Sequence, residues 1–351
     1  MRRDSMNPRE RWQAAIGGGR PDRIPLDYRA TDEATAKLLA HLRCGPDEMY
    51  ARLHIDKVVG VAPGYVGPPV APDADVLGCR YTDVDYGTGS YRECVYHPLA
   101  QFQSAEEIEA SYHWPDPDWW NYSMIKEQVL GKEHLPISGG GSEPFLVYAH
   151  LRGQEQAYID LLADPAMVHY CLDKLYGLAY TNSQRIYEQI PGKVLLMDMG
   201  EDMGTQESLL FSPKQIHEFF LPWMKRMMDL AHQAGAYVMT HSDGAVRAII
   251  PDLIEAGMDI LDPVQWRCKG MEREGLKRDF GDSISFHGAM DNQYTLAFGS
   301  EEEVRQEVRD NVGILGRDGR LILGPCHNIQ PITPPERVAA MYEEAYACGW
   351  L

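Results

Sequence analysis

The chain has 351 residues, of which 44% are hydrophobic and 24% are charged, and its formal net charge is −19. This length suits one large domain or two ordinary ones, and the composition is that of a soluble globular protein. The negative charge is spread along the chain and leaves no basic surface for phosphates. A nucleic-acid-binding protein is therefore disfavoured.

Neither the hydropathy nor the cysteines indicate export or membrane insertion. No stretch approaches 18 consecutive apolar residues, so we expect no membrane span. The N-terminal MRRDSMNPRERW has basic residues but no apolar segment behind them, which argues against a signal peptide. The seven cysteines are scattered and form no Cys-x-x-Cys pair, as is common in a reducing compartment. We therefore expect a cytoplasmic protein.

Eight short apolar runs recur along the chain, and most are followed by Gly, Asp or His and then by an amphipathic helix. Such runs are typical of parallel strands covered on both faces. Their alternation with helices predicts a single (β/α)8 TIM barrel over residues 1–351. An open doubly wound sheet is the alternative, but no G-x-G-x-x-G follows the first run. The runs are IPLDY (24–28), DKVVGV (56–61), LPISGG (135–140), VLLMDMG (194–200), AYVMTH (236–241), MDILDP (258–263), ISFHGAM (284–290) and RLILGP (320–325).

The repeat is interrupted between the second and third runs by more than seventy residues. Tyrosines flank the turn Gly87-Thr88-Gly89, which predicts a β-hairpin within 79–98. The segment HWPDPDWWNY (113–122) then reads as an aromatic, proline-rich loop. We expect 75–122 to form an insertion into the barrel. It is either an edge hairpin with a surface loop, or a lid or partner-docking surface.

Three helices between the runs have clear boundary signals. Ser212 and Pro213 suit the start of the first, and Pro222 should kink it. The second begins with the capping-box pair Ser300 and Glu303. The predicted helical segments are 212–235, 300–316 and 333–349.

Polar side chains collect where the last five runs end. The carboxyl ends of barrel strands meet at one rim, where the active sites of this architecture lie. A histidine at a strand end can instead be a hydrogen-bonded core residue, and a buried cysteine is often packing. The candidates are Glu201, Asp202 and Gln206 after the fourth run, His241 and Asp243 after the fifth, Asp262 and Gln265 after the sixth, His287 and Asp291 in and after the seventh, and Cys326, His327 and Asn328 after the eighth.

Several of these stretches resemble the uroporphyrinogen decarboxylase superfamily. The resemblance covers nearly the whole chain and implies a (β/α)8 barrel. Its opening, RERWQAAIGGGRPDRIPLDY, is similar to that of divergent bacterial members. The other matching stretches are GEDMGTQ, HSDGAVRAIIPDLIEAGMDILDPVQ, FHGAMDNQYTLAFGS and GPCHNIQPITPPE.

The superfamily holds two chemistries. Its decarboxylases use no metal and bind the substrate carboxylates through arginines in an N-terminal M-R-Q-A-G-R run. The corresponding stretch here, LDYRATDEATAKLL, keeps only Arg29. Without these guanidinium groups a polyanionic tetrapyrrole loses its bidentate anchors, so uroporphyrinogen decarboxylation is disfavoured.

The other branch comprises zinc-dependent methyltransferases that work with a corrinoid protein and carry His-x-Cys with a distal Cys. His241 and Cys326 stand at the His and distal Cys positions, and Asp243 replaces the middle Cys. The resemblance therefore implies zinc held by His241, Asp243 and Cys326, since all three ligand types bind zinc. It further implies catalytic roles for Glu201, Asp202 and His287, with Glu201 as a proton donor or a further ligand. Substrate contacts are expected from Gln206, Asp262, Gln265, His327 and Asn328.

We therefore expect a zinc-dependent methyltransferase that moves a methyl group between a small methyl donor and the cobalt of a separate corrinoid protein. This chain has no Asp-x-His-x-x-Gly motif for holding the corrinoid (cobalamin) itself. The oxygen ligand Asp243 favours a methoxy donor and hence an O-demethylase component. A ring-bearing donor would suit the aromatic loops, which contain Tyr81, Tyr86, Trp119 and Trp120.

Two alternatives stay open: a metal-free decarboxylase and a non-catalytic corrinoid- or tetrapyrrole-binding protein. The resemblance also allows a homodimer.

Overall fold

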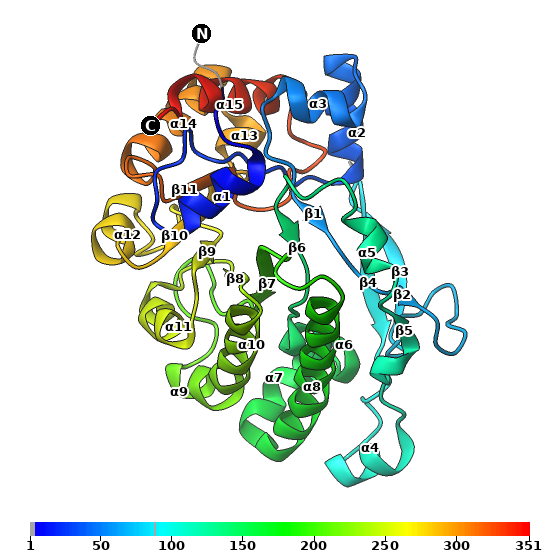
Figure 1. The fold of residues 1–351 in the computed structure, drawn as a ribbon. Helices are drawn as coiled ribbons and strands as arrows, with labels where there is room; N and C mark the ends of the chain where they lie inside the picture. The colour runs from blue at the N-terminus through cyan, green and yellow to red at the C-terminus, as the bar shows by residue number, and fades with distance from the viewer. Residues whose placement is uncertain (1–3, 88) are drawn as a thin grey trace.

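A curled sheet of parallel strands forms the centre of the computed structural model, which describes residues 4–87 and 89–351 (Figure 1). Seven of the eight predicted runs contain its strands, and the sheet order is β1-β6-β7-β8-β9-β10-β11. The prediction of a TIM-barrel fold is thereby confirmed. The strands are β1 (Val59–Gly60), β6 (Ile137–Ser138), β7 (Leu196–Gly200), β8 (Tyr237–His241), β9 (Ile260–Asp262), β10 (Ser285–Met290) and β11 (Leu321–Pro325).

The first predicted run takes the eighth place around the barrel without forming a regular strand. Its backbone pairs with β11, because Leu323 donates to Pro25 O and Asp27 donates to Leu323 O, each at 2.9 Å. On its other side, Asp56 N donates to Leu26 O at 2.8 Å, just before β1 begins. These bonds link the two edges of the sheet, so the polar strand ends face one another around a ring.

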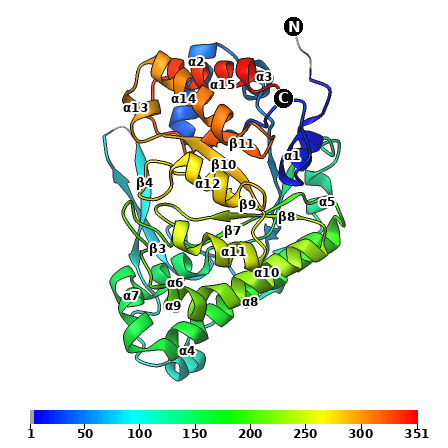
Figure 2. The same cartoon turned by 90° about the vertical axis from the view of Figure 1, so that its left-hand side faces the viewer.

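Helices surround the sheet on its outer side (Figures 1 and 2). Along the first half of the chain they are α1 (Pro8–Ile16), α2 (Asp32–Leu42), α3 (Pro46–Arg52), α4 (Ala105–Ser111), the 3-10 turn η1 (Pro117–Trp119), α5 (Ile125–Gln128), α6 (Pro144–Arg152), α7 (Gln154–Ala163) and α8 (Pro165–Gln189). The second half adds α9 (Pro213–Gln215), the π-helical turn η2 (Ile216–Phe220), α10 (Leu221–Gln233), the 3-10 turn η3 (Arg247–Ile249), α11 (Ile250–Ala256), α12 (Arg273–Phe280), α13 (Thr295–Phe298), α14 (Glu301–Ile314) and α15 (Pro335–Cys348). No helix among the described residues is long and apolar enough to cross a membrane.

The three predicted helices are confirmed. Ser212 forms a capping box with Gln215, and the π-helical turn η2 ends at Phe220, two residues before Pro222, whose ring nitrogen cannot donate to the preceding turn. The interruption expected at this proline therefore takes the form of a widened turn. Ser300 and Glu303 form the predicted capping box of α14. α15 starts at Pro335, slightly later than predicted.

The predicted hairpin is also present. β3 (Arg80–Asp85) pairs antiparallel with β4 (Ser90–Tyr96), while Thr88 in the predicted turn lies outside the described residues. A second small ribbon joins β2 (Gly64–Tyr65) to β5 (Trp120–Asn121) within the aromatic loop. Figure 1 shows both ribbons beside the barrel, so the chain between β1 and β6 is an addition to its wall.

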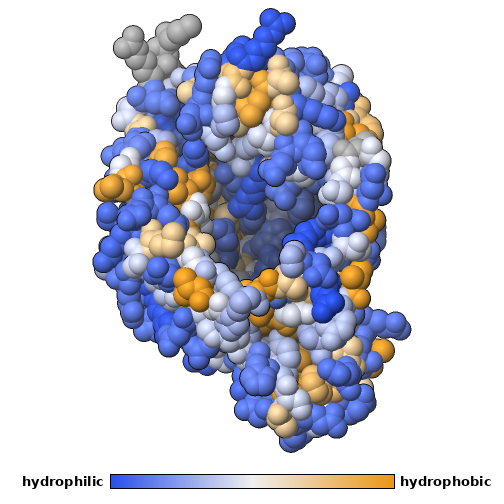
Figure 3. Space-filling view, turned by 90° about the vertical axis from the view of Figure 1, so that its right-hand side faces the viewer, coloured by the Kyte–Doolittle hydropathy of each residue, from blue (hydrophilic) through white to orange (hydrophobic). Residues whose placement is uncertain are grey.

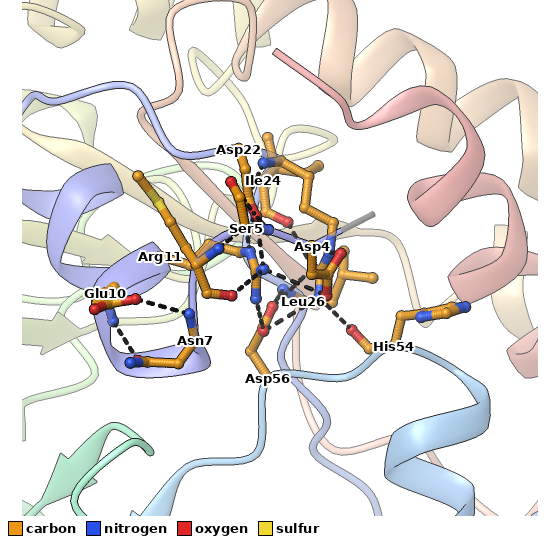
Figure 4. A network of polar contacts seen from close by, with 12 residues as sticks. Asp4, Ser5, Asn7, Glu10, Arg11, Asp22, Ile24, Leu26, His54 and Asp56 are labelled. Atoms are coloured by element: carbon orange, nitrogen blue, oxygen red, sulfur yellow. Dashed lines mark hydrogen bonds and ion pairs between the residues drawn. The ribbon is translucent and has the colours of Figure 1, made fainter. Parts of the chain in front are cut away.

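Buried ion pairs fix the amino-terminal end of the barrel (Figure 4). Asp56, 1% exposed, accepts from Arg11 Nη1 at 2.5 Å and from Arg23 Nη1 at 2.8 Å. Its second oxygen also accepts from Leu26 N at 3.0 Å. The same contacts orient α1, whose Trp12 packs with residues of β7 to β9 and β11. One carboxylate thus joins α1, the closing segment and the chain before β1.

We predict that Asp56→Asn lowers the free energy of unfolding by about 1–3 kcal/mol, because it removes the buried charge shared by Arg11 and Arg23, which keep only their pairs with Asp4 and Asp22. Denaturant unfolding of both proteins measures this. Asp47→Asn is the matched control, since Asp47 is 93% exposed in its contact with Lys57 and should change stability by less than about 0.5 kcal/mol. Equal effects of the two substitutions would contradict a structural role for the network.

Candidate active site and metal centre

The carboxyl ends of the strands surround a cavity of about 840 Å³. Figure 3 shows a deep hollow, with a mainly hydrophilic interior, in the face of the molecule on the side of β1 to β5. The cavity lining is acidic, with five carboxylates against one arginine, Arg29. The carboxylates are Asp27, Glu143, Asp198, Asp202 and Asp262.

A group able to hold a metal ion lies at the ends of β7 and β8. Asp202, His241 and Asp243 each offer a ligand atom, and these atoms lie within 4.8 Å of one another. The two loops that carry them approach closely at Gly200, where an added Cβ would lie 2.2 Å from His241 O. Glycine at this position therefore allows the three side chains to converge.

Neighbouring side chains orient this group. Gln265 donates to Asp243 Oδ1 at 2.8 Å and accepts from Gly244 N at 2.7 Å. Asp262 Oδ2 lies 3.3 Å from His241 Nδ1, while His241 Nε2 faces Asp202 at 3.5 Å. A carboxylate on one imidazole nitrogen, with the other nitrogen facing the ligand group, is the usual support of a metal-binding histidine.

The charge of His241 follows from these contacts. Burial lowers its pKa, but the carboxylates of Asp202 and Asp262 outweigh burial and raise the pKa to about 11. The imidazole of the metal-free protein is therefore a cation at neutral pH. A metal ion that binds Nε2 must displace this proton, so its apparent affinity should rise with pH.

Asp262 is the hub of a buried charge network beneath the metal group. It contacts His287 Nδ1 at 2.5 Å and Arg29 Nη1 at 2.8 Å. Asp27 completes the network, with Oδ2 at 3.0 Å from His287 Nε2 and at 3.1 Å from Arg29 Nε. His287 is fully buried between two carboxylates and does not line the cavity. The structure thus places His287 behind Asp262, away from a substrate in the cavity.

Glu201 differs in position from the sequence-based expectation. It is 2% exposed, does not line the cavity, and accepts from Phe145 N at 2.7 Å and Tyr176 OH at 3.2 Å. Burial raises its pKa to about 8. The carboxyl therefore anchors the start of α6. Glu143, which the sequence analysis did not select, lines the cavity from the same loop region.

The position of Cys326 also differs from the one expected from the sequence. Its thiol lies 3.2 Å from Val264 O, to which it donates, and burial raises its pKa well above the usual value. It lines the cavity but is not part of the group formed by Asp202, His241 and Asp243. The ligand group found in the structure contains Asp202 in the place expected for Cys326, and a role of Cys326 as a metal ligand stays a prediction.

The remaining candidates divide by position. His327 and Asn328 line the cavity, whereas Gln206 and Gln265 do not. Gln206 contacts Gln293 at 3.3 Å, and Asp291 pairs with Arg267 at 2.6 Å, away from the cavity. Substrate contacts of His327 and Asn328 stay a prediction that their position allows.

Comparison with known proteins identifies the family to which the chain belongs. The sequence model of the uroporphyrinogen decarboxylase (URO-D) family matches residues 121–347. The chain belongs to this family. It is 25% identical over 231 residues to the uroporphyrinogen decarboxylase of Anaeromyxobacter sp. (strain Fw109-5), covering 62% of this chain and 60% of that protein. It is 24% identical over 230 residues to that of Anaeromyxobacter dehalogenans (strain 2CP-C), with the same coverage of 62% and 60%. The matched region thus spans about 60% of the length of these relatives.

A methyltransferase from Methanosarcina mazei has the same fold. The two structures match with a TM-score of 0.70 at 17% identity, covering 98% of this chain and 99% of that one. The agreement over nearly the full length confirms the barrel expected from the sequence. The activity of this chain must be inferred from its own site.

We predict that Glu201→Gln removes a pH-dependent loss of stability. The pKa of Glu201 is raised from 4.5 to about 8, so its contribution is fully present below about pH 4.5 and is lost as the pH rises through about 8. At about pH 8.5 the variant should gain about 4–5 kcal/mol relative to the wild type, compared with their difference at about pH 4. Urea unfolding at both pH values measures this. The exposed Glu188→Gln is the control, and an unchanged pH dependence in Glu201→Gln would contradict the buried carboxyl.

Proposed function

We propose that the protein is a methyltransferase that moves a methyl group between a small methyl donor and the cobalt of a separate corrinoid protein. A divalent metal, expected to be zinc, would be held by Asp202, His241 and Asp243. The observation that carries the proposal is this ligand group beside a cavity of about 840 Å³.

The ligand group fits a divalent metal. Imidazole nitrogen and carboxylate oxygen are both accepted zinc ligands, and three protein ligands leave a position open for a substrate atom. Zinc bound there would supply a Lewis acid for the departing oxygen of a methoxy compound. Asp262 would hold the His241 ring in place, and Gln265 would hold the Asp243 carboxylate.

The acidic cavity argues against a polycarboxylate substrate. Of the residues that the structure describes, Arg29 is the single arginine in the lining, and Asp27 and Asp262 already pair with it. Uroporphyrinogen decarboxylation is the second candidate function, because the curated relatives described above carry this name. It would require the substrate carboxylates to approach five protein carboxylates without a free guanidinium partner.

A methoxy donor, and thus the role of an O-demethylase component, is favoured by the two aspartates of the ligand group, because carboxylates make a hard, oxygen-preferring site. One wall of the cavity is apolar and suits a small organic molecule. It is formed by Tyr28, Leu146, Val147 and Met199. A role of the aromatic loops in holding a ring-bearing donor stays a prediction. The residues that line the cavity do not include Tyr81, Tyr86, Trp119 or Trp120.

We predict that His241→Ala loses the bound metal whereas Cys326→Ala retains it, since Cys326 lies outside the ligand group. Both folded variants are loaded with zinc, dialysed and analysed by inductively coupled plasma mass spectrometry. Circular dichroism checks the fold. Loss of zinc in Cys326→Ala with retention in Asp202→Ala would instead support the set His241, Asp243 and Cys326.

We predict that the zinc-loaded protein transfers methyl groups from a methoxy compound to a Co(I) corrinoid protein, observed as the change in the corrinoid absorption spectrum. Asp243→Asn should lower the rate at least about 100-fold, because loss of a ligand charge weakens metal binding. Binding of the corrinoid protein without turnover would support a non-catalytic binding protein. Release of carbon dioxide from uroporphyrinogen would support the decarboxylase.

A further inference from the structure

Glu143 differs from the other carboxylates that line the cavity. Its side chain is half-buried and, among the described residues, it makes no hydrogen bond or ion pair, although it stands at the N-cap of α6. The others are engaged. Asp27 and Asp262 pair with Arg29, Asp198 accepts from Ser138, and Asp202 faces His241.

The backbone before Glu143 is fixed against β7. Gly141 has φ of 90°, and an added Cβ would lie 1.7 Å from Asp198 O. Gly141 N donates to Ser183 Oγ at 3.0 Å, and Gly200 N donates to Ser142 O at 3.3 Å. Only glycine allows this approach, so the loop presents Glu143 to the cavity from a defined position.

The surroundings of Glu143 suit a proton donor. In the metal-free protein, burial raises the pKa of Glu143, the His241 cation opposes this effect, and Asp202, Asp262 and Asp243 add to it. The charges of the metal group thus reach the Glu143 carboxyl across the cavity. Glu201, the donor expected from the sequence, is hydrogen-bonded behind the wall and cannot contact a molecule in the cavity.

We propose that Glu143 is the general acid that protonates the departing oxygen of the methyl donor, an inference that rests on the proposed methyl transfer and adds a catalytic residue to it. Two observations carry it: Glu143 lines the same cavity as Asp202 and His241 of the metal group, and no described residue makes a hydrogen bond or ion pair with its carboxyl.

The bond between methyl carbon and oxygen breaks, and its electron pair stays on oxygen. The Co(I) corrinoid of the partner protein supplies the electron pair for the new bond to the methyl carbon. Glu143 gives its proton to the oxygen, which leaves as an alcohol or phenol, and the Glu143 carboxylate regains a proton from solvent.

The test compares donors with different leaving groups. Benzyl methyl ether releases a poor leaving group that needs a proton, whereas 4-nitroanisole releases a stabilised phenoxide that does not. We expect Glu143→Gln to lower kcat at least about 100-fold with benzyl methyl ether and less than about 5-fold with 4-nitroanisole. The wild-type rate with benzyl methyl ether should fall at high pH, and the variant should lose this fall.

Glu155→Gln, on the exposed first turn of α7, is the matched control and should behave as the wild type. An equal loss with both donors, or loss of zinc from Glu143→Gln, would overturn the acid role and leave the methyltransferase standing. An unchanged rate of Glu143→Gln with both donors would also overturn the acid role without affecting the proposed methyltransferase. A wild type that demethylates neither donor would overturn the proposed function and this role with it.

Discussion

The site depends on the buried carboxylate of Asp262. It is 2% exposed, yet it faces Arg29, His241 and His287, so its pKa lies well below the usual range despite burial. A carboxylate at this depth is tolerated only because these donors surround it. In return it fixes the His241 ring, and through His241 the geometry of the whole ligand group. The charge network and the metal group are therefore one unit.

Much of this architecture could be predicted from the sequence. Apolar runs alternating with helices indicate the barrel, because strands covered on both faces need apolar residues on both sides. Because the carboxyl ends of barrel strands meet at one rim, the sequence also predicts that His241, Asp243 and Asp262 lie close together. The irregular first strand could not be predicted. Its closure rests on the buried contacts of Asp56 with Arg11 and Arg23, which join segments far apart in the chain.

The departures from the expected site have a common physical cause. Periodicity and spacing identify the strand that carries a residue, whereas the direction of a side chain after the strand depends on loop conformation. Cys326 lies 3.2 Å from a backbone carbonyl instead of joining His241. Glu201 anchors the start of α6, while Glu143 reaches the cavity because Gly141 allows its loop to touch β7. Glycines before an acidic residue, as in SGGGSE, were the available signal.

We propose that oxygen and nitrogen atoms alone, those of Asp202, His241 and Asp243, would hold the metal. X-ray absorption spectroscopy at the zinc edge of the loaded protein tests it most directly, because zinc–sulfur distances of about 2.3 Å separate from zinc–nitrogen and zinc–oxygen distances of about 2.0–2.2 Å. We expect zinc to be surrounded by nitrogen and oxygen, with an imidazole signature that is unchanged in Cys326→Ala. A sulfur shell that disappears in Cys326→Ala would contradict it.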